Sequence, residues 1–221
     1  MNTSTRASYA SPDQAHASTA KTPLLRPYGL IMPQATRSQS APFWPGVFPD
    51  AHCKNLAAVY LDALNEPELQ LQITPQLCTD ARNWLHAELA TITRLGFWPL
   101  FTDEESLLPD TIAAFNQPCV DGETTAIPIT SLYNKDKHPV WTPLENLLFR
   151  FVHDYHHWVI GADATFTGEL AVTRHTLTPA VRKNDALARF LASEPVGQSA
   201  LFITSGTYPV QIIARNILDL I

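Results

Sequence analysis

Apolar residues recur at helical spacing in two stretches of the first half of this chain. A first helix is predicted to start after Asp50, as its N-cap, and to run to about Asn65, because apolar positions there follow i, i+3, i+4, i+7 and i+8. A second is predicted to open at Thr79 or Asp80 and to end at Gly96, a residue type common just past helix ends. Both helices have one face suited to a core.

The clearest helix start in the chain is Thr142-Pro143-Leu144-Glu145. Thr142 can cap the helix, Pro143 suits its first turn, and Glu145 can reach back in a capping box. The helix is predicted to run to about Ile160 and to end at Gly161. It is apolar on nearly all sides, which is typical of a helix buried among others.

The remaining stretches are mostly helical in pattern. A short helix is predicted around Glu169, another over 184–205 with an interruption near Pro195, and a last one from Pro209 to the end of the chain. Prolines break up residues 97–140, where we expect a helical turn at 112–115 and an extended piece at 125–132. No run of strict alternation is long enough to predict a sheet, so the predicted fold class is all-α, mostly helical.

Composition divides the chain at about residue 42. Residues 1–42 are rich in Ser, Thr, Ala, Gln and Pro, and we expect them to be disordered, with a single compact helical domain over 43–221. Four basic residues and one acidic residue give residues 1–42 a net charge of +3; since the whole chain has a net charge of −6, the remainder carries −9. A basic, Ser-rich segment also fits an organelle-targeting sequence, although a plain flexible tail on a cytoplasmic protein is the preferred interpretation.

Charge and cysteine content exclude some partners. The chain has a pI of about 5.7 and no cluster of Lys and Arg, so it does not look like a nucleic-acid-binding protein. No apolar run approaches the roughly 20 residues of a membrane-spanning helix, although peripheral membrane contact stays open. Three widely spaced cysteines form no disulfide framework and indicate reduced thiols. The sequence leaves the oligomeric state open.

The predicted helix over residues 143–160 carries a dense group of metal-ligating side chains. His153 and His157 lie one turn apart, away from the broad apolar arc, and can chelate one ion from a single helix face. Asp154 could be a further ligand or could orient one. A turn after Gly161 can bring Glu169 back over the end of this helix, and two histidines with a carboxylate are a common metal-ligand set.

Two other histidines are weaker candidates for this site. His156 points about 60° away from His157, and His175 lies a turn and a half past Glu169. The histidines could instead be ordinary residues of an exposed face. However, two buried imidazoles without a partner would each cost on the order of 1–3 kcal/mol, and a shared metal ion removes that cost. A divalent ion is therefore predicted, Zn²⁺ first, with Mg²⁺, Mn²⁺ or iron as alternatives.

The pattern His153-Asp154-x-x-His157-x11-Glu169 resembles the HDxxH-x11-E signature of the Coq4 family of ubiquinone-biosynthesis proteins. Identity and spacing agree at all four positions, and the matching stretch covers about 25 of the 221 residues. The resemblance implies a helical fold and makes these four residues the metal-site positions. It also implies membrane association, apolar quinone precursors as substrates, and removal of a ring substituent. The same core is similar to uncharacterised bacterial and phage proteins.

Three functions follow as expectations. The first is a metal-dependent enzyme, or a scaffold, of the Coq4 type that acts on a bulky, partly apolar aromatic small molecule. The second is a metal-dependent hydrolase, either an HD-type phosphohydrolase with His86 and Asp185 as further ligands, or a zincin-like peptidase. In the latter, Asp154 would replace the usual Glu and reach the water poorly. The third is a non-catalytic interaction protein with a structural metal, which a closed four-ligand site would favour.

Overall fold

Helices α1 (Ala51–Asn65) and α2 (Pro75–Arg94) open the described part of the computed structural model, which comprises residues 50–103, 125–131, 138–163, 165–206 and 209–221. The Asp50 carboxylate caps α1 by accepting a hydrogen bond from the Cys53 amide at 2.7 Å, as predicted. The start predicted for α2 was wrong. Thr74 caps that helix, with Pro75 in its first turn, so it begins four or five residues earlier than Thr79 or Asp80.

Two short strands follow α2. β1 (Trp98–Thr102) and β2 (Ala126–Thr130) pair in parallel, with Trp98 opposite Ala126 and Thr102 opposite Thr130. The extended piece predicted at 125–132 is confirmed, but the expectation of no sheet was wrong. Each strand has only five residues, so the alternation in β2, where Ile127 and Ile129 are buried, is too short to stand out in the sequence. The helical turn expected at 112–115 lies outside the described residues.

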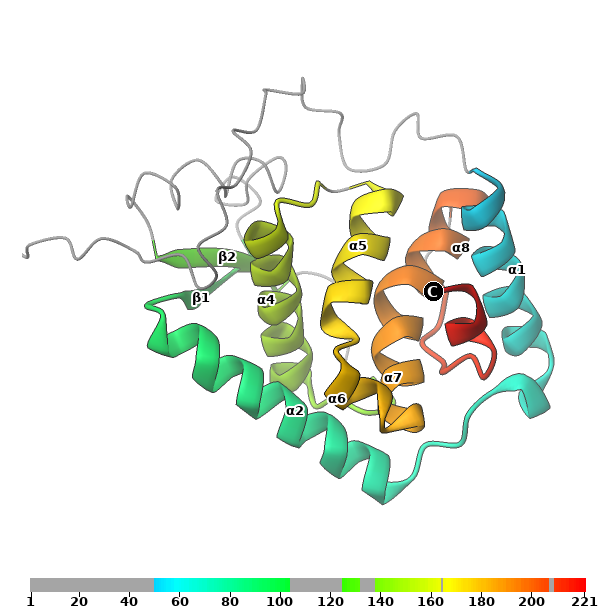
Figure 1. Ribbon diagram of the computed structural model, residues 1–221, viewed down its shortest axis with the longest axis horizontal. Helices are drawn as coiled ribbons and strands as arrows, with labels where there is room; N and C mark the ends of the chain where they lie inside the picture. Colours follow the sequence, from blue (N-terminus) through cyan, green and yellow to red (C-terminus); the bar gives the residue numbers. More distant parts are fainter. Residues whose placement is uncertain (1–49, 104–124, 132–137, 164, 207–208) are drawn as a thin grey trace, which may run out of the picture.

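The central element is α4 (Pro143–Ile160), which lies between α2 and α5 (Figure 1). The predicted capping box is present: the Thr142 hydroxyl accepts from the Glu145 amide, and the Glu145 carboxylate accepts from the Thr142 amide. Gly161 ends the helix in the left-handed conformation, with φ 66°. Burial all around α4 agrees with its apolar pattern. Its buried residues are Asn146, Phe149, Phe151, Val152, Tyr155, His156, His157, Trp158 and Val159.

Shorter helices complete the domain: α5 (Phe166–Thr176), α6 (Pro179–Arg182), α7 (Asp185–Ala192) and α8 (Gln198–Ser205). The interruption predicted near Pro195 is a π-helical segment, Ser193–Gly197, that joins α7 to α8 without breaking the coil. Gly206 ends α8 with φ 75°, as predicted.

The last segment differs from its prediction. Residues from Pro209 onward do not form an α-helix; they run extended and end in a 3₁₀ turn, Ile217–Leu220. An isolated antiparallel bridge pairs Gln70 with Ala214. The buried Tyr60 hydroxyl donates to the Val210 carbonyl and accepts from the Ile212 amide, both at 3.1 Å. These tertiary hydrogen bonds replace the helical ones that the apolar spacing alone suggested.

One core unites these elements. Aromatic rings around α4 form its centre, with Phe97 against Tyr155 and Trp158 on one side and Trp141 against Phe149 on another. The domain is compact and mostly helical, which confirms the predicted fold class. Among the helices described, none has the length and apolar character needed to cross a bilayer.

Candidate metal centre

A tight reversal between α4 and α5 brings the ends of these two helices together. The Ala162 amide donates to the His157 carbonyl, and Asp163 Oδ1 accepts from the Thr165 hydroxyl at 2.6 Å. Thr165 in turn caps α5 by accepting from the Gly168 amide at 3.2 Å. Gly168 packs so closely on the loop that a Cβ there would meet the Asp163 carbonyl oxygen. The next residue along, Glu169, is thereby held against the last two turns of α4.

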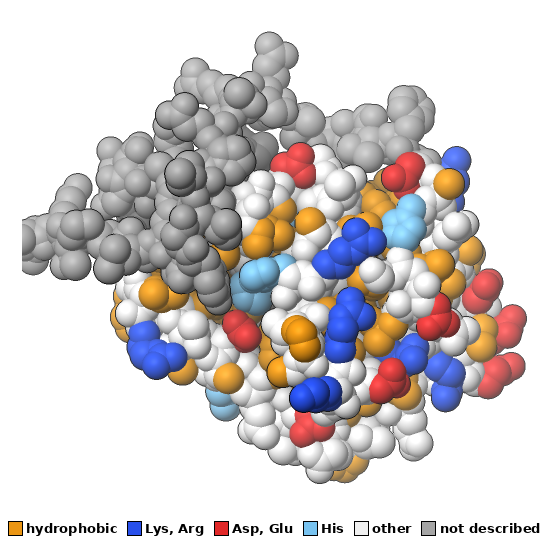
Figure 2. Space-filling model, in the orientation of Figure 1, with side chains coloured by type: hydrophobic (Ala, Val, Ile, Leu, Met, Phe, Trp, Pro, Cys, Tyr) orange, Lys and Arg blue, Asp and Glu red, His pale blue; other side chains and the backbone are white. Residues whose placement is uncertain are grey.

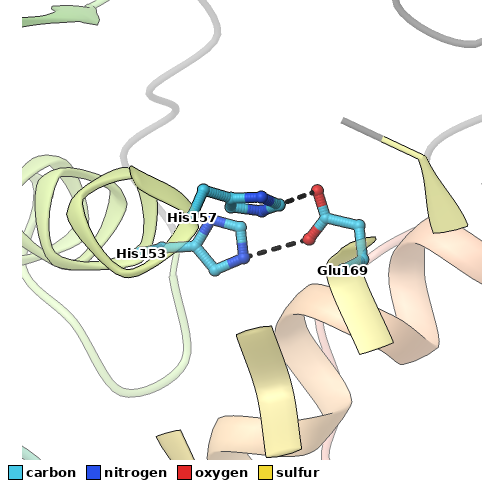
Figure 3. A group of neighbouring side chains, drawn as sticks. All are labelled: His153, His157 and Glu169. Carbon is cyan, nitrogen blue, oxygen red and sulfur yellow. Dashed lines mark ion pairs between the residues drawn. The ribbon is translucent and has the colours of Figure 1, made fainter. Parts of the chain in front are cut away.

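Three of the predicted site residues converge at this reversal (Figure 3). His153 Nε2 lies 3.0 Å from Glu169 Oε2, and His157 Nε2 lies 3.3 Å from Glu169 Oε1. The two rings stand edge to face, with centroids 4.7 Å apart and planes at 70°. One ligand atom from each residue lies within 4.8 Å of the others, so the group could hold a metal ion. The predicted pairing of histidines one turn apart with Glu169 is therefore present in the fold.

The ring nitrogens at the centre of this group face the Glu169 carboxylate. Both Nε2 atoms are buried, and each lies within ion-pair distance of a Glu169 oxygen without meeting the geometry of a good hydrogen bond. Without a metal ion, this arrangement needs a proton on at least one buried ring. A shared cation coordinated by both Nε2 atoms and the carboxylate would replace that proton. The side chains present thus fit a divalent ion.

Oxygen atoms on the far side of each ring hold the histidines in this orientation. His157 Nδ1 lies 3.4 Å from the Ala162 carbonyl oxygen, which can only accept, so Nδ1 carries the proton and Nε2 keeps its lone pair. His153 Nδ1 lies 3.5 Å from Asp154 Oδ1. Asp154, expected either as a ligand or as an orienting group, is outside the converging set and occupies the orienting position.

Charge in the metal-free group is set by the carboxylate. Burial alone would lower the pKa of His153, but the charge of Glu169, helped by Asp154, outweighs it and raises that pKa to about 10. Burial pushes the pKa of Glu169 up, yet the charges of His153 and His157 dominate and lower it far below its usual range. At neutral pH the group therefore contains an imidazolium and a carboxylate. A metal ion would take the place of the imidazolium proton.

The other candidates lie elsewhere. His156 contacts Thr176 and Glu88 rather than the centre, in line with its predicted direction. His86 is exposed on α2, and the Asp185 side chain is 67% exposed and pairs with Arg189. Neither belongs to the converging group found among the described residues, so the additional ligands that an HD-type hydrolase needs are not assembled there.

Two contributions to the site were not predicted. The Ala162 carbonyl orients His157, and a backbone group of this kind leaves no signal in side-chain types. Gly168 permits the close approach of the loop, and the only hint in the sequence is a glycine inside the first turn of a helix, where it is otherwise unfavourable.

Comparisons of the chain with family models, with curated proteins and with solved structures find no match.

Proposed function

We propose that this chain is a metalloprotein that binds one divalent ion, most favourably Zn²⁺, through His153, His157 and Glu169. The observation that carries the proposal is the convergence of two buried Nε2 atoms on one carboxylate, each within 3.0–3.3 Å of a Glu169 oxygen. Two nitrogens and one oxygen form a ligand set that suits Zn²⁺ and iron better than Mg²⁺, which prefers oxygen alone. Mn²⁺ remains an alternative ion.

We further propose that the ion is catalytic and that the protein is a Coq4-type enzyme acting on a bulky, partly apolar aromatic molecule. The support is the HDxxH-x11-E pattern together with a ligand set of three side chains, since catalytic zinc sites commonly have three protein ligands and an open position. When bound, the ion would polarise a phenolate or carbonyl oxygen of the substrate. Glu169 and the two imidazoles hold the ion, while Asp154 and the Ala162 carbonyl keep the rings in place.

The reaction assigned by this proposal is removal of a ring substituent in quinone assembly. His153 is the most exposed side chain of the group, at 17%, so the approach of a substrate is assigned to its side. We place the protein in the cytoplasm, with delivery to an organelle through residues 1–42 as the alternative that a fluorescent fusion would reveal.

Metal content tests the first part of the proposal. Protein purified without a metal-affinity tag is expected to contain about one divalent ion, measured by inductively coupled plasma mass spectrometry. His153→Ala and Glu169→Gln are expected to lose it, while His86→Ala, an exposed histidine on α2, retains it. Wild-type protein that takes up no ion after incubation with Zn²⁺, Fe²⁺ or Mn²⁺ would refute the site.

Turnover tests the second part. The metal-loaded protein is incubated with a prenylated hydroxybenzoate, and loss of the ring carboxylate as CO₂, with a proton taking its place on the ring, is followed by mass spectrometry. Product that depends on both the metal and Glu169 supports the enzyme. A tightly held ion without turnover, combined with a fourth protein ligand seen by X-ray absorption, would favour the non-catalytic alternative of a structural metal.

A further inference from the structure

A second cluster of metal-ligating side chains lies where α2, α4 and α5 meet. It consists of Glu88 on α2, His156 on α4 and His175 on α5. His156 Nε2 lies 3.4 Å from Glu88 Oε2, and the rings of His156 and His175 stand edge to face with centroids 5.0 Å apart. Figure 2 shows pale-blue histidine atoms at separate places on this face of the molecule. None of these three side chains belongs to the centre around Glu169.

The geometry of this cluster parallels that of the first centre. In the first centre, the ring centroids of His153 and His157 are 4.7 Å apart and the ring planes are at 70°. In this cluster, the ring centroids of His156 and His175 are 5.0 Å apart and the planes are at 79°. In each case a glutamate oxygen lies 3.0–3.4 Å from a histidine Nε2. Two ligand atoms that each lie about 2.0–2.1 Å from a tetrahedral Zn²⁺ are separated by roughly 3.3 Å, so the spacing between Glu88 and His156 matches a shared ion.

Neighbouring groups prepare His156 to be a ligand. Its Nδ1 lies 3.1 Å from the Thr176 hydroxyl, which leaves Nε2 directed at Glu88. The His175 ring stands edge to face against the His156 ring and adds a second imidazole to the cluster. The carboxylate of Glu88 completes a set of two nitrogens and one oxygen.

Exposure distinguishes the two clusters. The Glu88 side chain is 31% exposed and His175 is half-buried, whereas Glu169 is 7% exposed. Only the first centre, among the described residues, has a ligand atom from every member within 4.8 Å of the others. Glu88 or His175 must therefore rotate to complete the second set, and a partly solvated side chain can do so at small cost. The resulting affinity is lower than that of the first centre.

We propose that Glu88, His156 and His175 form a second, weaker binding site for a borderline divalent cation such as Zn²⁺ or Co²⁺. The ion would connect three helices, α2, α4 and α5, through one shared set of ligands. Binding there stabilises the folded state in proportion to its occupancy, because the ligands come together only in the fold. The site is independent of the activity proposed for the first centre.

Co²⁺ titration of the untagged, metal-free protein tests this site. Visible absorption is expected to report two binding events, the second at least tenfold weaker than the first, with a further rise in melting temperature as the second site fills. His175→Ala and Glu88→Gln, both at partly exposed positions, are expected to weaken the second event by about tenfold or more and to leave the first unchanged. His86→Ala, on the same helix as Glu88, is the matched control and should retain both events.

The first centre is removed separately by Glu169→Gln. In that variant the weaker event should persist, which separates failure of this site from failure of the first centre. A single binding event in the wild type, or a second event that survives both His175→Ala and Glu88→Gln, would overturn the proposal.

Discussion

Loading the metal-free protein with Zn²⁺ at pH 7.5 is expected to release about one proton per ion. Burial tends to lower the pKa of His153, but the carboxylate of Glu169 raises it to about 10, so the ring is almost fully protonated at this pH. A metal ion needs the Nε2 lone pair and must displace that proton. Because pH 7.5 lies about 2.5 pH units below that pKa, the competition lowers the apparent binding free energy by on the order of 3 kcal/mol.

Isothermal titration calorimetry in buffers with different ionisation enthalpies measures this release. The observed enthalpy plotted against buffer ionisation enthalpy has a slope equal to the number of protons exchanged, and a slope near one is expected. The apparent association constant should also rise by about tenfold for each pH unit between pH 6.5 and 8.5, where His153 stays protonated in the free protein.

Glu169→Gln is the matched variant, since it keeps the size of the side chain and removes its charge. Without that charge, burial lowers the pKa of His153 and only Asp154 still raises it, so a smaller share of the rings is protonated before metal is added. Proton release should fall below that of the wild type, together with much of the affinity. Wild-type binding that releases no proton and does not change with pH would show that the charge pair between His153 and Glu169 does not form.

Three further predictions concern stability. The charge pair between His153 and Glu169 should stabilise the metal-free protein most between pH 4.5 and 6.5. Because the pKa of His153 is raised, the stabilisation from its positive charge is lost as pH rises from 6.5 through about 10; because the pKa of Glu169 is lowered, the stabilisation from its negative charge is lost as pH falls below 4.5. Urea unfolding across this pH range measures both losses. Gly168→Ala should cost about 1–3 kcal/mol and weaken metal binding at least tenfold, because the new Cβ displaces the Asp163 carbonyl; unchanged thermal stability and affinity would contradict this packing. Tyr60→Phe should lower the free energy of unfolding by roughly 1–3 kcal/mol, because it leaves the Ile212 amide without its acceptor; a change below about 0.5 kcal/mol in urea unfolding would argue against that hydrogen bond.

Local signals in the sequence predicted α4 and the positions of its two candidate ligands well. Thr142, Pro143 and Glu145 define the helix start through neighbouring atoms alone, and Gly161 defines its end. The positions of His153 and His157 then follow from helical geometry, which is why their pairing could be predicted. The position of Glu169 was harder to predict, because it depends on how the loop between α4 and α5 folds. That loop is short, so few positions of α5 relative to α4 are possible.

Elements that depend on distant contacts were predicted poorly. Val210, Ile213 and Ile217 have helical spacing, but Val210 is 72% exposed and the segment bonds to Tyr60 and to residues 69–71 instead. The pairing of β1 with β2 likewise joins segments far apart in the chain, and neither strand is long enough to be predicted from its alternation of apolar and polar residues. The orienting position of Asp154 also depended on the side-chain arrangement and could not be chosen from its place on the helix.

The extended C-terminal segment has a consequence for how the protein is made. Tyr60 on α1 bonds to residues 150 and 152 positions later, and the Leu71 amide donates to the Ile213 carbonyl. During synthesis, α1 leaves the ribosome long before these partners exist, so the Tyr60 hydroxyl has neither of these two backbone partners until residues 210–212 have been made. Such sequence separation slows folding and leaves apolar surface open to association in the meantime. Packing around Tyr60 is therefore expected to be completed late in folding, when residues 209–213 join the rest of the domain.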